Sequence, residues 1–580
     1  MVYGNKNWLI KNIYSERSRT MKITGAEILM RSLLQEKVEV IFGYPGGANM
    51  PIYDALYFYG KKFHHILVRH EQGAAHAAEG YARVTGKPGV CLVTSGPGAT
   101  NLVTGIADAM MDSVPMVCIT GQVAAEFLGS DAFQEADVVG ITTPITKWNC
   151  QLTHADEIPE AVAKAFYITN HGRPGPVVID ITKNAQFEKV EFKYPKNFYV
   201  KKLKTVNKYN SGDIKKAAEI INHAKKPLML VGHGVLISKA EKEVLQVIEK
   251  TGMAVASTLH GLSSVPFDHP LYVGMLGMHG NYSPNKLTNS ADVIFAVGMR
   301  FDDRVTGKLS KYVPIAKVIH IDVDESEHHK NVRAHLPLLG NVKDVLISLL
   351  PHLKKNNHKN WLGEFKKLDK KELMWEKKRQ EKNKNKITMD IVLSLLSKKT
   401  KNEAVIVADV GQNQMFSARY YKYKKPDSYI TSGGLGTMGF AVPAAIGAKI
   451  GAPKRLVFAV VGDGGIQMTI QELGTIMQER LPIKILLLNN EFLGMVRQWQ
   501  QLFFEKRYSF THMENPDFIK LASSYGIKGE KIEIRKKLDS ALDKFINFKG
   551  PYLLEVKVEK EDNIFPMVAT GTSIDEVRLE

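Results

Sequence analysis

The chain has 580 residues with 44% hydrophobic content, so we expect several domains, most simply three. No apolar run approaches the roughly 20 residues of a membrane span, which argues against a membrane protein. The three cysteines (Cys91, Cys118 and Cys150) form no CxxC pair, so a disulfide framework is not expected and a reducing, cytoplasmic compartment is favoured.

The formal net charge of +18 raises the possibility of nucleic-acid binding. The lysines concentrate in expected linkers and surface helices, and no zinc-finger or RRM-like signature accompanies them. A solvated surface is therefore favoured, with no nucleic-acid partner. Residues 1–20 are basic, and their first acidic residue is Glu16. We interpret them as an N-terminal extension without a secretory signal, with organellar targeting as the alternative.

Residues 21–186 predict a first α/β domain. Strand-like runs occur at residues 38–42, 66–68, 89–94, 114–120 and 176–181. A tight loop, GYPGGA, follows the first run, and Glu71 opens an Ala-rich helix. His70, Glu71 and His76 superficially suggest the HExxH motif of a metallohydrolase. That motif requires its two histidines one helical turn apart, whereas His76 is five residues after Glu71. We therefore expect no zinc there. An ordinary first-turn carboxylate is the alternative role for Glu71.

Residues 206–351 predict a second α/β domain. The run Pro227–Val231 leads into Gly232-His-Gly234, and a lone GxG of this kind is only weak evidence for a nucleotide. A later strand ends in Asp322-Val-Asp324, which lacks the glycine and the distal glutamate of a calcium loop. Strand-end carboxylates instead suit a ribose or an adenine edge. The charged segment 352–386 follows as a linker, for which we expect a spacing role.

Residues 387–560 predict the third domain, and residues 561–580 form a C-terminal tail. Within this domain, the run 455–492 predicts a strand, an acidic turn, a helix, a second strand and a polar turn. Such a βαβ unit brings Asp463 and Asn490 to one edge of a parallel sheet. Their carboxylate and amide oxygens suit Mg²⁺, and the glycines around Asp463 let the backbone approach a diphosphate. The alternative is that Asp463 merely caps its helix.

The motifs GDG and NN in this run resemble the signature of the thiamine diphosphate enzymes. Other motifs resemble those of the acetohydroxyacid synthases, also called acetolactate synthases, and the resemblance covers nearly all of residues 22–575. These motifs are GYPGGA (43–48), HEQGAAHAAEGYAR (70–83), TSGPGATN (94–101), GSDAFQEADVVGI (129–141), GMHG (277–280) and the segment 298–307. The resemblance implies three doubly wound parallel-sheet domains in the order pyrimidine-binding, FAD-type and diphosphate-binding. It also implies the cofactors thiamine diphosphate, Mg²⁺ and FAD.

The resemblance assigns roles to individual residues. It implies that Mg²⁺ is bound by Asp463, Asn490 and the carbonyl of Phe492. It implies that thiamine diphosphate is bound by Glu71, Gln412, Gly436, Met438, Gly464 and Met495. It implies that FAD is bound by Arg173, Gly232, Gly234, Met278, His279, Arg300 and Asp322. Glu71 is the catalytic carboxylate for the aminopyrimidine ring, Gly47 faces the thiazolium, and Arg304 receives the second substrate's carboxylate. Phe133, Gln134 and Lys147 line the active site or its channel, and Trp499 favours 2-ketobutyrate as the acceptor.

The implied activity is decarboxylation of pyruvate and ligation to pyruvate or 2-ketobutyrate, in the synthesis of valine, leucine and isoleucine. The implied assembly is a homodimer or tetramer with a regulatory small subunit. Three positions depart from the family pattern: Asn341 replaces Asp, Asn413 replaces His, and Gly465 replaces a common Ser. Two alternatives remain. One is a pyruvate oxidase or glyoxylate carboligase, although Glu71 argues against the carboligase. The other is a basic nucleic-acid-binding or scaffold protein without catalysis.

Overall fold

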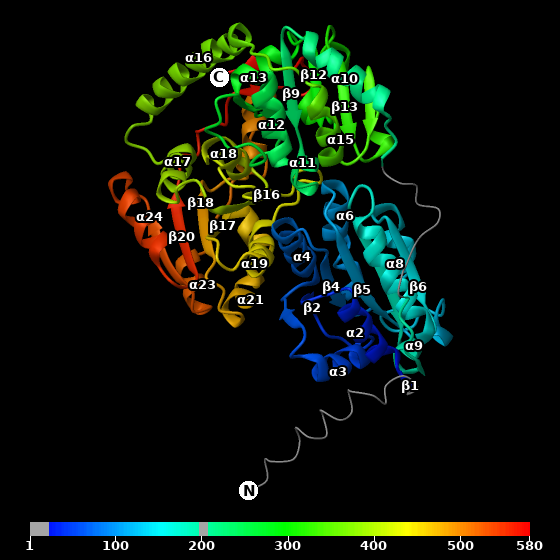
Figure 1. The fold of residues 1–580 in the computed structure, drawn as a ribbon. Helices are drawn as coiled ribbons and strands as arrows, with labels where there is room; N and C mark the ends of the chain where they lie inside the picture. The colour runs from blue at the N-terminus through cyan, green and yellow to red at the C-terminus, as the bar shows by residue number, and fades with distance from the viewer. Residues whose placement is uncertain (1–21, 196–206) are drawn as a thin grey trace. The chain divides into compact units, whose positions relative to one another are not determined.

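Runs rich in Val, Ile and Leu form three six-stranded parallel sheets in the computed structural model, which describes residues 22–195 and 207–580 (Figure 1). The predicted N-terminal extension, residues 1–20, lies outside the described residues. The chain divides into two compact units near residue 203: the first holds one sheet and the second holds two. The predicted fold of three α/β domains is confirmed.

The N-terminal sheet is entirely parallel. Its strands, in spatial order, are β3 (His64–Leu67), β2 (Val40–Gly43), β4 (Gly89–Val93), β5 (Met116–Gln122), β7 (Pro176–Thr182) and β6 (Trp148–Leu152). Its helices are α2 (Gly25–Gln35), α3 (Met50–Tyr59), α4 (Glu71–Thr85), α5 (Pro97–Thr100), α6 (Val103–Asp112), α7 (Val138–Thr142), α8 (Ile158–Asn170) and α9 (Lys183–Phe187). A separate antiparallel pair joins β1 (Lys22–Thr24) to β8 (Lys189–Glu191).

The central sheet is also entirely parallel. Its strands, in spatial order, are β11 (Tyr272–Met275), β10 (Ala254–Ser257), β9 (Pro227–Val231), β12 (Val293–Val297), β13 (Lys317–Asp322) and β14 (Leu336–Leu339). Its helices are α10 (Ser211–His223), α11 (His233–Ile237), α12 (Glu241–Thr251), α13 (Tyr282–Thr288), α14 (Asp303–Thr306) and α15 (Val342–Leu349). The long helix α16 (Lys359–Lys382) then leads to the third sheet.

The C-terminal sheet is the third parallel sheet. Its strands, in spatial order, are β16 (Tyr429–Thr431), β15 (Val405–Ala408), β17 (Val457–Gly462), β18 (Lys484–Asn489), β20 (Tyr552–Lys557) and β19 (Lys528–Ile532). Its helices are α17 (Met389–Lys399), α18 (Gln412–Tyr420), α19 (Ala441–Gly451), α20 (Asp463–Met468), α21 (Leu473–Gln478), α22 (Gly494–Phe503), α23 (Phe518–Ser524) and α24 (Leu538–Asn547). The tail ends in the short pair β21 (Met567–Val568) and β22 (Val577–Arg578).

The N-terminal and C-terminal sheets share one strand order. Counted from the first strand of each sheet, both read 2-1-3-4-6-5, whereas the central sheet reads 3-2-1-4-5-6. In all three, the chain leaves the first strand toward one edge and later returns to its other side. Each sheet therefore contains a topological switch point, between β2 and β4, between β9 and β12, and between β15 and β17, where α/β proteins bind ligands.

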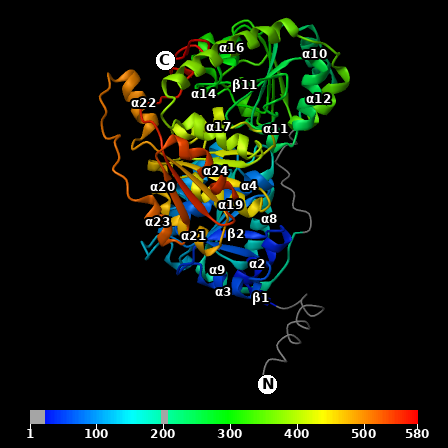
Figure 2. The same cartoon turned by 90° about the vertical axis from the view of Figure 1, so that its left-hand side faces the viewer.

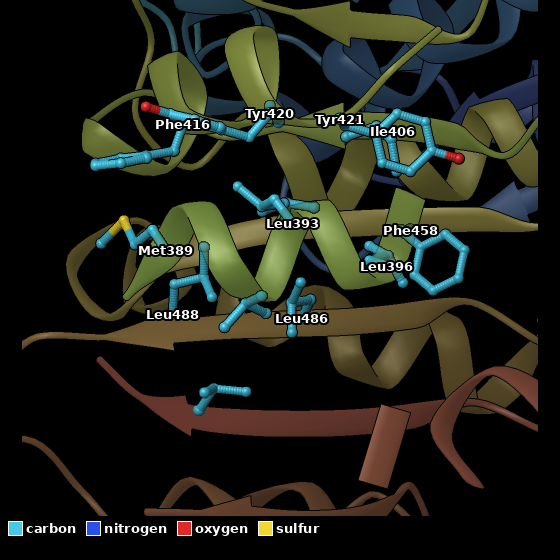
Figure 3. Packing of buried hydrophobic residues seen from close by; sticks show 14 of the residues in the cluster. Met389, Leu393, Leu396, Ile406, Phe416, Tyr420, Tyr421, Phe458, Leu486 and Leu488 are labelled. Carbon is cyan, nitrogen blue, oxygen red and sulfur yellow. The ribbon is translucent and has the colours of Figure 1, made fainter. Parts of the chain in front are cut away.

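Buried side chains cover both faces of the central sheet. Along β9, Met229 and Val231 pack into one core, and Leu228 and Leu230 pack into the other, as expected for a strand with period two. In the C-terminal domain, α17 packs between the sheet and α18 (Figure 3). This burial explains the nearly continuous apolar runs that predicted the strands.

Two local expectations were wrong. The sequence did not predict β6, because this edge strand is mostly half-buried and has no continuous apolar run. The helical pattern after Asp463 is broken into α20 and α21, because Thr469 leaves the helical conformation and donates a hydrogen bond to the carbonyl of Gly439 (2.7 Å).

The charged segment 352–386 is more than the spacer that the sequence predicted. Its helix α16 runs along the central domain (Figure 2) and buries Trp361 and Phe365 in the second core of the central sheet. Val568 and Ile574 of the C-terminal tail join the same core. Helix α16 and the tail therefore cover one face of the central sheet, and the central domain is completed by segments from outside its predicted boundaries.

Buried ion pairs at two places attach α16 to the C-terminal domain. Glu372 binds the guanidinium of Arg419, which also donates to the carbonyls of Gly280 (2.7 Å) and His279 (3.2 Å). Arg379 contacts Asp390 (2.7 Å) and Asp562. Among the described residues, no helix is both long enough and apolar enough to cross a membrane.

We predict that Glu372→Ala destabilises the second unit by about 3–5 kcal/mol, because it leaves the buried guanidinium of Arg419 with only the more distant carboxylate of Glu376 (3.7 Å). Denaturant unfolding followed by tryptophan fluorescence measures this loss. The matched control on α16 is Glu364→Ala, whose ion pair with Lys226 is exposed and contributes about 1 kcal/mol or less. Equal effects of the two substitutions would contradict the assigned role of the buried pair.

Candidate functional site

The switch point of the C-terminal sheet lies between β15 and β17. Parallel strands end at the same edge of a sheet, so the segments after β15, β17 and β18 meet there. These segments carry Gln412, Asp463 and Asn490. All three side chains are buried, with exposed fractions of 4%, 1% and 4%.

Asp463 is the first residue of α20, and the alternative that it caps this helix is wrong. The N-cap is Gly462, which has no side chain, and the Asp463 carboxylate accepts a hydrogen bond from Asn515 (2.8 Å) instead. Asn515 is oriented in turn by Gln467, whose amide donates to it (3.0 Å). Burial raises the pKa of Asp463, and the donors from Asn515 and the main chain oppose that rise.

Asn490 is held by its neighbours on both sides of its amide. Its nitrogen donates to Gln412 Oε1 (3.3 Å), and its oxygen accepts from the backbone of Phe492 (3.1 Å). A Cβ on Gly494 would lie 2.3 Å from Gln412 Oε1, so a side chain at this position would displace the Gln412 amide. The sequence interpretation missed the roles of Gly494 and Asn515, because neither residue directly follows a predicted strand or belongs to a recognised sequence motif.

Seven predicted site residues line one small cavity of about 50 Å³ at this switch point. They are Gln412, Met438, Asp463, Gly464, Asn490, Phe492 and Met495. Gly436 lies two residues before Met438 and has a φ of +75°, a conformation that favours glycine. The cavity thus combines carboxylate, amide and carbonyl oxygens with glycine backbone that a ligand can approach closely. This combination fits a small hard cation and the diphosphate that it would bind.

Asp409, directly after β15, organises the turn that carries Met438. Its carboxylate accepts hydrogen bonds from the backbone of Gly439 (3.0 Å) and Ala441 (2.9 Å). A Cβ on Gly465 would lie 2.4 Å from Asp409 Oδ1, so a serine at this position would displace that carboxylate. Asn413 donates to the carbonyls of Asp409 (2.8 Å) and Val460 (3.2 Å), which fixes its amide beside the cavity.

In the N-terminal unit, Glu71 is the first residue of α4 and is 9% exposed. Asn101 donates to Glu71 Oε2 (2.9 Å). The other carboxylate oxygen faces Gly98, where an added Cβ would lie 3.4 Å from Oε1. Gly98 belongs to the turn after β4, at the switch point of this sheet. Glu71 is thus a buried carboxylate with one oxygen fixed, at the place where the topology predicts a ligand.

The loop after β2 reaches the same switch point. The backbone of Ala48 donates to Thr94 (3.2 Å), the first residue after β4, and a Cβ on Gly47 would meet nothing within 4 Å. Gln134 has a φ of +61°, which is strained for a residue with a side chain, and its backbone packs against Gly96. Phe133 beside it is 87% exposed. Gly47 and Gln134 therefore lie at this switch point.

Lys147 and Arg173 make local contacts in the N-terminal unit. Lys147 donates to the carbonyls of His171 (2.6 Å) and Ile168 at the end of α8. Arg173 donates to Ser113 (2.8 Å) and to the carbonyl of Met111 (3.3 Å). Both side chains stabilise helix ends in this structure, and their predicted roles toward substrate and FAD stay predictions.

The FAD residues predicted in the central domain follow the carboxyl ends of its strands. Gly232 and Gly234 follow β9 at the switch point, and their Cα positions leave no room for a Cβ beside Gly298. Arg300 follows β12, Asp322 ends β13, and Met278 and His279 follow β11. The structure thus brings these residues to one edge. Asn341, which replaces the family aspartate, caps α15 by accepting from the backbone of Lys343 (3.0 Å).

Arg304 and His279 lie beside each other at this edge. Arg304 contacts the sulfur of Met278 (3.4 Å) and lies 3.7 Å from Asp303, while more than half of its side chain stays exposed. Burial, together with the charges of Arg419 and Arg304, lowers the pKa of His279 to about 3. His279 is therefore neutral at neutral pH, and Arg304 is available to an anion.

Comparisons with known proteins agree with this arrangement. The thiamine pyrophosphate enzyme N-terminal TPP binding domain matches residues 23–141, the central domain matches residues 214–349, and the C-terminal TPP binding domain matches residues 409–556. The acetolactate synthase large subunit of Buchnera aphidicola subsp. Schizaphis graminum is 45% identical over 571 residues, which cover 96% of this chain and 98% of that protein. The acetolactate synthase isozyme 2 large subunit of Escherichia coli K12 is 44% identical over 556 residues, with 96% and 99% covered. Isozyme 3 of the same organism is 42% identical over 567 residues, with 96% and 98% covered.

We predict that Gly465→Ala destabilises the second unit by about 1–3 kcal/mol, because the new methyl group displaces the Asp409 carboxylate from two backbone donors. The control is Gly363→Ala in α16, where an added Cβ meets nothing within 4 Å. Because alanine favours the helix, that change is expected to stabilise by about 0.5–1 kcal/mol. Denaturant unfolding measures both, and a neutral Gly465→Ala would contradict the role of Asp409.

Proposed function

The chain belongs to the acetolactate synthase large subunits, a family of thiamine diphosphate (thiamine pyrophosphate) enzymes, and from this premise we propose how its residues perform the reaction. The activity is the thiamine diphosphate-dependent condensation of pyruvate with a second 2-ketoacid, in the synthesis of branched-chain amino acids. The products are 2-acetolactate from pyruvate and 2-aceto-2-hydroxybutyrate from 2-ketobutyrate.

One observation carries the proposal: Asp463, Asn490, Gln412 and the carbonyl-bearing Phe492 line one cavity at a switch point. We assign Mg²⁺ to the oxygens of Asp463, Asn490 and Phe492, which are the hard ligands that this ion prefers. The bonds from Asn515 to Asp463 and from Asn490 to Gln412 hold the ligands in place before the metal binds. Gly464, which lines the same cavity and has no side chain of its own, would let the diphosphate approach the backbone.

Bound thiamine diphosphate supplies an electron sink for the decarboxylation of a 2-ketoacid. Glu71 holds a proton at its Oε1 atom and exchanges it with the aminopyrimidine ring, while Asn101 fixes Oε2. Met438 supports the cofactor from the turn that Asp409 orders, and its terminal methyl lies close to Gly464. Gly47 leaves open space for the thiazolium side of the cofactor.

Arg304 receives the carboxylate of the second 2-ketoacid. Its guanidinium is exposed, always charged and able to bind a carboxylate through two hydrogen bonds. The neutral His279 does not compete for that carboxylate as a second cation. Trp499, which packs against Phe503 (5.1 Å between ring centroids), offers an apolar surface to the extra methyl group of 2-ketobutyrate.

We assign FAD to the crevice at the carboxyl edge of the central sheet, between β9 and β12. Gly232 and Gly234 would hold its diphosphate, and Asp322 would accept hydrogen bonds from its sugar. The flavin undergoes no net redox change in the condensation. Its binding is supported by the 3-2-1-4-5-6 strand order of this sheet, which is the order of dinucleotide-binding domains.

We also propose that the chain forms a homodimer or tetramer and binds a regulatory small subunit. The small subunit is supported by the names of the relatives, which are large subunits. Cytoplasmic location is supported by the three free cysteines, which suit a reducing compartment.

An acetolactate assay with pyruvate tests the activity. We expect product only when thiamine diphosphate and Mg²⁺ are both present. EDTA is expected to remove the activity, because Asp463 and Asn490 would hold the metal that diphosphate binding needs, and added Mg²⁺ is expected to restore it. Colorimetric detection of acetoin after acid decarboxylation measures the product. Full activity in the absence of thiamine diphosphate would refute the proposal.

Glu71→Gln tests the catalytic carboxylate. We expect acetolactate formation to fall by about 10²–10⁴-fold, the usual contribution of acid–base catalysis, while thiamine diphosphate still binds. Product formation and a cofactor titration followed by fluorescence measure the two effects separately. The control is Glu160→Gln on α8, an exposed carboxylate that should leave both unchanged. Near-normal activity of Glu71→Gln would remove Glu71 from the mechanism.

A further inference from the structure

Gln498 is a buried amide on α22 to which neither the sequence interpretation nor the comparisons assign a role. Its side chain has no solvent exposure, and four hydrogen bonds engage it. Its oxygen accepts from Gln412 Nε2 (3.0 Å) and from the backbone of Ile564 (2.9 Å). Its nitrogen donates to the carbonyl of Ile564 (3.1 Å) and to the sulfur of Met567 (3.6 Å). Every donor and both acceptor directions of the amide are therefore used.

One side of this amide reaches the metal and diphosphate site. Gln412 donates through its nitrogen to Gln498 and accepts through its oxygen from Asn490. A glutamine amide can rotate, and its two ends differ in chemistry. The bond to Gln498 therefore determines which end of Gln412 faces Asn490. With that bond removed, only the longer bond from Asn490 (3.3 Å) would hold the oxygen of Gln412 in this orientation.

The other side of the amide reaches the C-terminal tail. Ile564 and Met567 belong to the segment that leaves the C-terminal domain and covers the central sheet. Just beyond them, the backbone of Val568 donates to the carbonyl of Met278 (2.8 Å), at the edge assigned to FAD and the second substrate. Gln498 thus joins a ligand-holding residue to the tail that borders Met278.

We propose that Gln498 is a positioning residue: it orients Gln412, and through it Asn490, for Mg²⁺ and diphosphate binding, and it couples this geometry to the C-terminal tail. The inference rests on the proposed function, because it assigns the cavity to that cofactor. Stability alone does not account for the residue, because the desolvation of a buried amide offsets much of what its hydrogen bonds contribute. An apolar side chain of similar volume would fill the same space.

The tail has separate anchors that let this idea be tested without losing the fold. Glu561 pairs with Arg497, and Asp562 pairs with Arg379. Neither contact involves Gln498. We therefore expect Gln498→Met, which keeps the volume but removes all four hydrogen bonds, to fold with its tail still attached.

The test measures binding of Mg²⁺ with thiamine diphosphate to the apoprotein by fluorescence titration, without reference to catalysis. We expect Gln498→Met to weaken this binding by about tenfold, since Gln412 loses its fixed orientation and Asn490 then loses a defined acceptor for its amide. We also expect the cofactor to slow tryptic cleavage after the exposed Lys560 in the wild type but not in the variant. The matched control is Gln500→Met on the same helix, whose amide bonds to Ser509 and Thr511 and not to Gln412, and it should behave as the wild type.

A double substitution separates positioning from general destabilisation. If Gln498 acts through Gln412, then adding Gln498→Met to Gln412→Met weakens binding no further. Fully multiplicative losses in the double variant, or wild-type affinity of Gln498→Met, would overturn the positioning role while leaving the proposed function intact. Absence of cofactor binding by the wild-type apoprotein would overturn both.

Discussion

The C-terminal site depends on a buried carboxylate at the end of a parallel strand. Because β15, β17 and β18 run in one direction, the segments that follow them are forced to one edge, and Asp463 is buried there beside Asn490. A buried anion is costly unless partners compensate it. Asn515 supplies one hydrogen bond, and a divalent cation would supply the remaining compensation. The same topology repeats in the N-terminal sheet, where Glu71 occupies the corresponding edge.

The central domain is not self-contained. One face of its sheet is covered by Trp361 and Phe365 of α16 and by Val568 and Ile574 of the tail. The buried pair of Glu372 and Arg419 fixes α16 to the C-terminal domain and also holds the backbone of Gly280. Packing that stabilises the central sheet therefore also sets the position of Met278 and His279. In the tail, Val568 both packs against the central sheet and donates its backbone hydrogen bond to the carbonyl of Met278.

Sequence patterns predicted the fold well wherever burial on both faces of a sheet demands unbroken apolar runs, as in Pro227–Val231. They also predicted the residues at strand ends, since topology alone brings Asp463 and Asn490 together. They failed where a residue acts through distant contacts. Asn515 and Gln498 lie in segments without a characteristic spacing, and only the folded chain places them against Asp463 and Gln412. The high charge of α16 concealed its two buried aromatic residues.

Anomalous diffraction from crystals grown with Mn²⁺ and thiamine diphosphate tests the central claim most directly. Mn²⁺ accepts the same oxygen ligands as Mg²⁺ and gives a signal that locates it. The account predicts one strong peak at coordination distance, about 2.1 Å, from the side-chain oxygens of Asp463 and Asn490 and from the carbonyl of Phe492. A peak bound elsewhere, with these three oxygens left uncoordinated, would contradict it.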